Sequence, residues 1–201
     1  MSVSVIVLAA GKGTRMNSEL PKVLHKVLGK SLLSHALDTL SFSDNKLVVV
    51  GHEADLVIDS LPPSIKNILQ KDQLGTGHAV STVINSEVFK ESKSDFTLVV
   101  PGDVPGINDG DIELLINKVK TTSSPVGFLT ALVEDPFGYG RVVKINEEIK
   151  IVEEKDCSED EKAINEINSG IYCFKTEFLI ENIDNLNTQN AQGEFYLTDL
   201  I

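Results

Sequence analysis

The most informative segment of the sequence is VSVIVLAAGKGTRM, residues 3–16. Its first part is largely apolar and β-branched, which predicts a buried strand from Val3 to Leu8. The strand runs at once into small residues, two glycines and two cations. Glycine removes the side-chain barrier to positive φ, so we expect Gly11 and Gly13 to let successive backbone N–H groups approach an anion. This loop is therefore predicted to hold the phosphates of a nucleotide.

Two cations are candidates for neutralising those phosphates. Arg15 offers a planar fork that can grip phosphate oxygens through two bonds, and Lys22, in a Leu-Pro-Lys extension, supplies a compact mobile charge. The loop is not a P-loop, which requires Gly-Lys-Ser/Thr, and not a dinucleotide fingerprint, because Met16 replaces the third glycine. The pattern therefore indicates a different class of nucleotide-binding protein.

Composition limits the remaining possibilities. A chain of 201 residues can bury a full core, and we expect one domain over residues 1–201. The formal net charge of −12 argues against nucleic acid as a partner. The two cysteines, Cys157 and Cys173, lack metal-ligand spacing and are interpreted as reduced thiols. The sequence shows no secretory leader and no stretch long enough to span a bilayer, so we expect a soluble cytoplasmic protein.

Strand-like and helix-like segments alternate, which favours an α/β fold with a mostly parallel sheet flanked by helices. Ligands of such sheets bind beyond the carboxyl ends of the strands, where both the glycine loop and Pro101-Gly102-Asp103 fall. The expected strands are Val3–Leu8, Lys46–Val50, Asn67–Gln70, Phe96–Val100 and Val126–Val133, and the expected helices are Ser31–Leu40, Gly77–Ile84 and Asp111–Val119.

The pattern changes from Pro136 onward. Arg141–Ile145 and Glu148–Val152 predict a hairpin, Asp156–Lys162 an acidic loop, and Asn168–Phe174 a further strand. We interpret residues 136–201 as a smaller β-rich lobe that faces residues 1–135.

Two further groups of residues carry chemistry. Asp103 follows a buried strand; alone it would be a turn former, but beside a triphosphate a carboxylate acts through Mg²⁺. Gln70 precedes a second glycine entry into a helix, and glutamine can both donate to and accept from the edge of a pyrimidine base, supported by Thr76. His78, in the same entry, is interpreted as a helix-start or packing residue.

The first loop and Leu-Pro-Lys resemble the signature of sugar nucleotidyltransferases. Further motifs, in order along nearly the whole chain, resemble the uridylyltransferase domains of bacterial bifunctional UDP-N-acetylglucosamine pyrophosphorylase / glucosamine-1-phosphate acetyltransferase proteins. These motifs are PKVLH at 21–25, QLGTGHA at 73–79, GDVP at 102–105, DPFGYGR at 135–141, IVEEK at 151–155, EINSG at 166–170 and NAQGEFYLTD at 190–199.

The resemblance implies a Rossmann-like mixed sheet with a β-rich sugar-binding lobe, and formation of UDP-N-acetylglucosamine and pyrophosphate from UTP and N-acetylglucosamine 1-phosphate for cell-envelope precursors. It implies Mg²⁺ on Asp103, and Arg15, Lys22 and Asp103 as the catalytic residues. The sugar phosphate is itself a nucleophile, so no general base is assigned. The nucleotide would contact Leu8, Ala9, Ala10, Gly11, Gly13, Lys22, Gln70, Gly75, Thr76, Pro101 and Gly102, and the sugar Gly140, Glu153, Asn168, Tyr196 and Thr198.

Three features leave alternatives open. Pro101 stands where the family usually has an aromatic residue. The family's second metal ligand, an asparagine, and its acetyltransferase β-helix both lie beyond the motifs present in these 201 residues. The truncated chain is therefore expected to bind nucleotide, with turnover in an extended version, and to be monomeric where the full-length protein is a homotrimer. The alternatives are a uridylyl- or thymidylyltransferase for another sugar 1-phosphate, or a catalytically silent nucleotide-sugar binding module.

Overall fold

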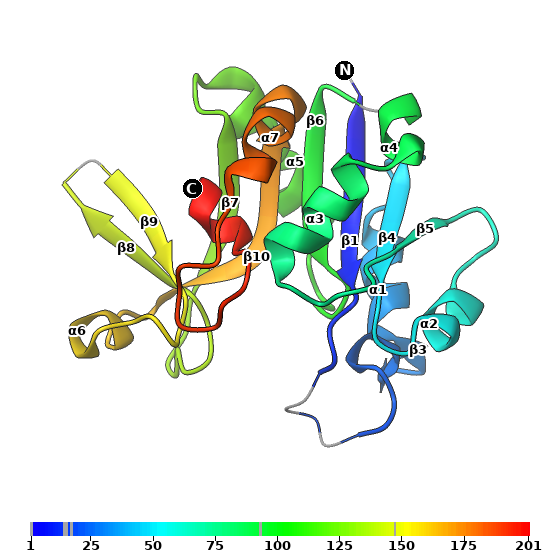
Figure 1. Ribbon diagram of the computed structural model, residues 1–201, viewed down its shortest axis with the longest axis horizontal. Helices are drawn as coiled ribbons and strands as arrows, with labels where there is room; N and C mark the ends of the chain where they lie inside the picture. Colours follow the sequence, from blue (N-terminus) through cyan, green and yellow to red (C-terminus); the bar gives the residue numbers. More distant parts are fainter. Residues whose placement is uncertain (1, 14–15, 17, 93, 147) are drawn as a thin grey trace.

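One mixed sheet runs through the whole molecule (Figure 1). The computed structural model describes residues 2–13, 16, 18–92, 94–146 and 148–201. Along the sheet the order is β5 (Lys66–Leu69), β4 (Lys46–Val50), β1 (Val3–Ala9), β6 (Phe96–Pro101), β10 (Glu166–Lys175), β8 (Arg141–Ile145) and β9 (Glu148–Val152), with β7 (Val126–Leu132) also paired to β10.

The first half of the sheet is parallel. β1 lies between β4 and β6, with Leu8 opposite both Val49 and Pro101. Strand β5 continues the parallel order beyond β4. A central strand of this kind is buried on both faces, which explains why its sequence is almost continuously apolar. The carboxyl ends of all four strands consequently lie at one edge of the sheet.

Helices cover both faces of that half. On one face α1 (Leu32–Thr39), α2 (Ala54–Ser60) and α5 (Asp109–Thr121) pack against the cluster that holds Val5 and Val7. On the other, α3 (Thr76–Ile84), α4 (Glu87–Ser92) and α7 (Thr176–Asn182) pack against the cluster that holds Ile6 and Val49. Alternate residues of β1 thus pack into two separate cores, as the two-residue period of a strand requires.

The elements predicted in this half form close to their expected limits. Ser31 caps α1 by accepting a hydrogen bond from the Ser34 N–H. Asn108 caps α5 in the same way, so this helix starts at Asp109, two residues before the expected start. Strand β5 begins and ends one residue earlier than expected, so Gln70 lies just beyond it, with its N–H donated to the Val50 carbonyl. Not predicted are α2, α4, α7, the β2–β3 pair (Lys26–Val27 and Lys30–Ser31), and the 3₁₀ turns η2 (Lys22–Leu24) and η3 (Ile183–Asn185). The helical turns expected near Ile201 form as the 3₁₀ turn η4 (Leu197–Leu200).

The second half is antiparallel and is organised by β10. This strand pairs with β6, β7 and β8, and β8 continues into β9 through the expected hairpin. The hairpin projects away from the helix-covered half (Figure 1). The expected acidic loop Asp156–Lys162 is wrong in its second half, because Ser158 and Glu161 form a capping box that starts the short helix α6 (Glu159–Lys162).

Both cysteines are free and buried, Cys157 near α6 and Cys173 in β10. Burial raises the pKa of the Cys173 thiol to about 12, so this sulfur stays protonated at neutral pH. Among the described residues, no helix combines the length and the apolar character that a membrane crossing demands.

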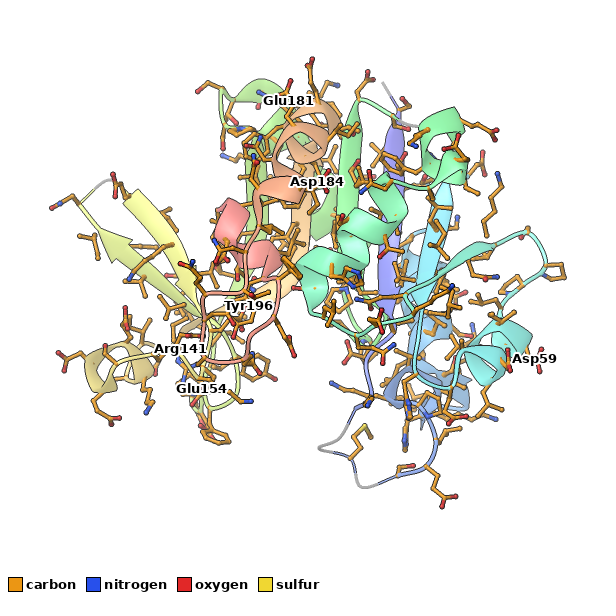
Figure 2. All side chains as sticks on the ribbon, viewed as in Figure 1. Asp59, Arg141, Glu154, Glu181, Asp184 and Tyr196 are labelled. Carbon is orange, nitrogen blue, oxygen red and sulfur yellow. The ribbon has the colours of Figure 1, made fainter. Side chains whose placement is uncertain are left out.

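A buried ion pair holds the base of the hairpin. Arg141 at the start of β8 is 1% exposed, and its Nη2 lies 2.8 Å from Glu154 Oε2 (Figure 2). The same carboxylate oxygen accepts the Gly138 N–H at 3.0 Å, and the Arg141 guanidinium also donates to the Tyr139 carbonyl. These bonds, first that from Gly138 and then that from Arg141, hold the pKa of Glu154 below its usual range.

We expect Arg141→Met to lower the free energy of unfolding by about 2–4 kcal/mol, because it removes one partner of a desolvated pair. Urea unfolding followed by far-UV circular dichroism measures the change. The matched control is Lys144→Met, which breaks the exposed pair with Glu166 and is expected to cost less than about 1 kcal/mol. Equal losses in the two variants would contradict a special role for the buried pair.

Candidate active site

The candidate site lies where the parallel strands end. Gly102 donates its N–H to the Leu8 carbonyl at 2.8 Å, and His52 donates its N–H to the Ala10 carbonyl at 3.1 Å. These bonds continue the sheet register for one step past β1, β4 and β6. These bonds hold three segments side by side: the first glycine loop, the start of the connection that follows β4, and the Pro101-Gly102-Asp103 turn.

A cavity of about 770 Å³ opens at this edge. It is large enough for a nucleotide together with part of a second ligand. Residues predicted for base, phosphate and sugar line it together: Leu8, Ala10, Gly11, Gln70, Gly75, Thr76, Pro101, Asp103, Glu153 and Asn168.

The two glycines of the first loop differ in what they require. Gly13 has φ +59°, and a Cβ there would lie 2.7 Å from the Lys22 Cβ, so this position needs glycine. Gly11 does not have a positive φ, and a Cβ there would meet open space, so the expectation of positive φ was wrong at this position. Ala9, also predicted to contact the nucleotide, is 2% exposed and packs into a core cluster. Arg15 lies outside the described residues.

Lys22 and Asp103 meet as an ion pair at this edge. Lys22 begins η2, which follows β1 along the chain, and Asp103 lies in the turn after β6. The Lys22 side chain is 45% exposed and that of Asp103 is 21% exposed, so both charges can reach solvent or a ligand. Because the ammonium sits on a flexible stem, it can leave the carboxylate for a phosphate oxygen.

The second glycine entry forms one wall of the cavity. Gly75 has φ +106°, and a Cβ there would lie 2.6 Å from the Phe195 carbonyl oxygen, so the loop packs directly on the C-terminal segment. Leu197 donates its N–H to the Thr76 hydroxyl at 3.2 Å. Thr76 therefore lines the cavity and also ties α3 to the end of the chain. The sequence alone predicts only a role toward a nucleotide base.

Glu153 and Asn168 lie on the β-rich side of the cavity. Asn168 donates its N–H to the Gly140 carbonyl, and a Cβ on Gly140 would lie 3.5 Å from both carboxylate oxygens of Glu153. These three predicted sugar residues are thus neighbours, although Gly140 does not itself line the cavity. The side chain of Asn168 donates to the Tyr172 hydroxyl at 2.5 Å.

Burial raises the pKa of Glu153, an effect only partly offset by the hydrogen bond that the Thr198 hydroxyl donates to Glu153 Oε1 at 3.2 Å. The negative charges of Asp156, Asp199 and Glu194 raise the pKa further. This side of the cavity is therefore acidic and suited to a ligand with several hydroxyl or amide donors.

Tyr196 is placed behind the cavity. Its hydroxyl donates to Asp156 Oδ2 at 3.1 Å and accepts from Gln192 at 2.8 Å, and burial raises its pKa to about 12. Asp156 also accepts the Ala191 N–H. Tyr196, predicted near the sugar, does not line the cavity, and its hydroxyl bonds tie the C-terminal segment to Asp156.

Other lining residues were not among the predicted site residues. No pattern in the sequence marks Tyr172, because it is one more apolar position along strand β10. Gly102, by contrast, was predicted to contact the nucleotide, but it is buried and does not line the cavity. The remaining lining residues are Lys12, Lys71, Asp72, Gln73, Leu74, Ala79, Gly170 and Glu194.

This fold and this cavity define an NTP transferase. The chain belongs to the family of the MobA-like NTP transferase domain, which matches residues 5–148. That span contains the parallel half of the sheet and most of the cavity, but not Glu153 or Asn168.

Relatives match over nearly the whole chain. It is 45% identical over 199 residues, 99% of its length, to the bifunctional protein GlmU of Fervidobacterium nodosum. It is 46% identical over 200 residues to the bifunctional protein GlmU of Clostridium beijerinckii. The chain spans 43% of the length of each of these relatives. These matches confirm the resemblance drawn from the motifs.

Solved structures share the fold at lower identity. A putative glucose-1-phosphate thymidylyltransferase from Bacillus anthracis, in complex with sucrose, superposes with a TM-score of 0.77 at 21% identity, over 99% of this chain and 81% of that one. A UDP-glucose pyrophosphorylase complexed with UDP-glucose gives 0.75 at 18%, over 100% of this chain and 85% of that one. The expected α/β fold is thereby confirmed.

We expect Glu153→Gln to stabilise the free protein at neutral pH by up to about 1 kcal/mol, since it removes a carboxylate whose ionised form is disfavoured. A raised pKa in the folded state means that the wild type loses stability as the pH rises through that pKa. The advantage of the variant should therefore be small near pH 4 and grow toward pH 7, as measured by thermal unfolding.

Glu181→Gln is the control, because Glu181 is an exposed carboxylate near the end of α7 (Figure 2). It should change stability by less than about 0.5 kcal/mol at either pH. A Glu153→Gln advantage that is absent, or that does not grow with pH, would show that the carboxylate is not penalised in the fold.

Proposed function

We propose that this chain is a nucleotidyltransferase that transfers the uridylyl group of UTP to N-acetylglucosamine 1-phosphate and releases pyrophosphate. One observation carries the proposal: a single cavity is lined by Gln70, Asp103, Glu153 and Asn168, which come from four separate parts of the chain. The 45–46% identity to GlmU proteins over nearly the whole chain supports this choice.

The reaction needs positioning and electrostatics rather than an activated side chain. A phosphate oxygen of the sugar phosphate attacks the α-phosphorus of UTP, the α–β phosphoanhydride bond breaks, and pyrophosphate leaves. The Lys22 ammonium can move from Asp103 to the triphosphate and balance charge on the leaving group. We propose the same role for Arg15, on the strength of its place in the first glycine loop.

A magnesium ion is part of this proposal. Asp103 supplies one partly exposed carboxylate that faces the cavity, which fits Mg²⁺, because that ion takes one or two carboxylates and completes its shell with phosphate oxygens and water. Among the described residues, no three His, Cys, Asp or Glu side chains gather as a complete cation site. Asp103 would hold the ion, which would neutralise phosphate charge when bound; the nucleotide would have to supply most of its other ligands.

The acidic side of the cavity supports an amino sugar as acceptor. Glu153 and Asn168 both lie beside the Gly140 backbone, and both line the cavity. A carboxylate can accept from sugar hydroxyls or from an acetamido N–H, and the carboxamide can serve its carbonyl. A thymidylyl- or uridylyltransferase for another sugar 1-phosphate is the nearest alternative, and a silent binding module is a second one.

The activity itself is tested by pyrophosphate release from UTP with N-acetylglucosamine 1-phosphate, compared with glucose 1-phosphate and with dTTP in place of UTP. We expect the first pair to give the highest kcat/KM, by about tenfold or more over glucose 1-phosphate, because glucose 1-phosphate lacks the acetamido group that Glu153 and Asn168 would contact. The assay should be run on this chain and on a version extended past Ile201. Binding of UTP without release in both would favour the binding module.

We expect Asp103→Asn to lower kcat by about 100-fold or more at saturating Mg²⁺, since it removes a carboxylate at the reacting phosphates. The concentration of Mg²⁺ that gives half-maximal rate should also rise. Asp59→Asn is the control, because Asp59 is an exposed carboxylate of α2, away from the cavity (Figure 2). An unchanged Mg²⁺ requirement in Asp103→Asn would place the ion elsewhere.

A further inference from the structure

The side chain of Gln70 is held by two acceptors. Gln70 is 3% exposed and lines the cavity. Its Nε2 lies 3.2 Å from the Gly75 carbonyl oxygen and 3.0 Å from His78 Nδ1. Since a carbonyl oxygen can only accept, the carboxamide atom beside Gly75 has to be the nitrogen, and its second hydrogen then points to His78.

This arrangement determines the tautomer of His78. Its Nδ1 must carry a lone pair to accept from Gln70, so the ring proton of neutral His78 is on Nε2. The ring does not line the nucleotide cavity. It faces instead a separate cavity of about 230 Å³ behind α3, together with Ser81, Asp184 and Phe195. His78 therefore acts on the nucleotide site only through the Gln70 carboxamide.

The Gln70 oxygen remains for a ligand. No described residue donates a hydrogen bond to Gln70 Oε1, and with both amide hydrogens used on Gly75 and His78, Oε1 is the group that is left for the cavity. An oxygen acceptor matches a base that offers an imide N–H, as uracil and thymine do at N3. The same oxygen disfavours the binding of cytosine, whose N3 is itself an acceptor, because two acceptors that face each other both lack a hydrogen bond.

We propose that His78 is a positioning residue for base selection: its Nδ1 holds the Gln70 carboxamide with the oxygen toward the nucleotide, and so selects a uracil-type base over cytosine. The proposal rests on the proposed uridylyl transfer for its substrate. Without His78 only the bond to Gly75 would oppose a flip of the carboxamide, so a fraction of the molecules would turn Nε2 toward the cavity. The same site would then accept either base.

The kinetic test compares kcat/KM for UTP and CTP, with N-acetylglucosamine 1-phosphate, in the wild type and in His78→Leu and His78→Asn. In His78→Leu we expect the KM for UTP to rise about tenfold with kcat changed less than about threefold, because the lost interaction is remote from the reacting phosphorus. The preference for UTP over CTP should fall by about tenfold. His78→Asn keeps an acceptor oxygen and should recover most of that preference.

His35→Leu is the matched control. It makes the same substitution and removes a ring hydrogen bond, to the Val27 carbonyl at 2.8 Å, but His35 does not line the nucleotide cavity. It should leave both KM and base preference at wild-type values. If His78→Leu also kept both values, or if His35→Leu changed them equally, the positioning role would be overturned.

Two outcomes separate this inference from the proposed function. A wild type that makes no product from UTP, or prefers CTP, would overturn uridylyl transfer and the inference with it. A wild type that prefers UTP while His78→Leu shows the same preference would overturn the inference alone. Nitrogen-15 NMR of the wild type tests the geometry without any variant, since we expect the Nε2–H tautomer of His78, and the Nδ1–H tautomer would exclude the proposed bond.

Discussion

The parallel pairing of β1 with β4 and β6 is the constraint on which the site depends. The register sets Leu8 beside Pro101 and Ala9 beside Val50, and hydrogen bonds from Gly102 and Gln70 carry the alignment one step past the strand ends. A strand buried on both faces cannot slip without moving its apolar residues out of two cores. The position of Asp103 relative to the first glycine loop is therefore determined by core packing rather than by the loops themselves.

In the antiparallel half, side-chain hydrogen bonds rather than strand pairing hold the residues of the site in place. Several acidic groups surround Glu153, which makes its ionised form costly. Hydrogen bonds limit that cost, because Thr198 donates to Glu153 and because Asp156 accepts from Tyr196 and Ala191. The C-terminal segment thus performs two tasks, since it also packs on Gly75 and accepts the Gly77 N–H. One strip of chain links the wall that would face the base to the wall that would face the sugar.

Much of this arrangement is predictable from sequence, for physical reasons that differ by element. Strands such as Lys46–Val50 are short apolar runs between turn signals, so their limits coincide with expectation. Helix α6 was missed, because its four polar residues lack an apolar period and only the Ser158–Glu161 capping pair marks its start. The bond from Gln70 to His78 could not be read from spacing, since it depends on side-chain rotamers. The altered placement of Tyr196 has the same origin: its partner Asp156 is 40 residues away.

Strand β10 has a consequence for how the two halves can move. Tyr172 to Lys175 pair with β6, Ile167 pairs with β8, and the bulge between them sets Gly170 against Pro101. One strand, β10, therefore belongs to both halves and joins them through backbone hydrogen bonds on each side of the bulge. A shared strand resists bending more than a loop does, so we expect the two halves to keep a nearly fixed separation when a ligand binds. Adaptation to a different acceptor would have to come from exchanging side chains along the cleft walls, with the distance between those walls kept constant.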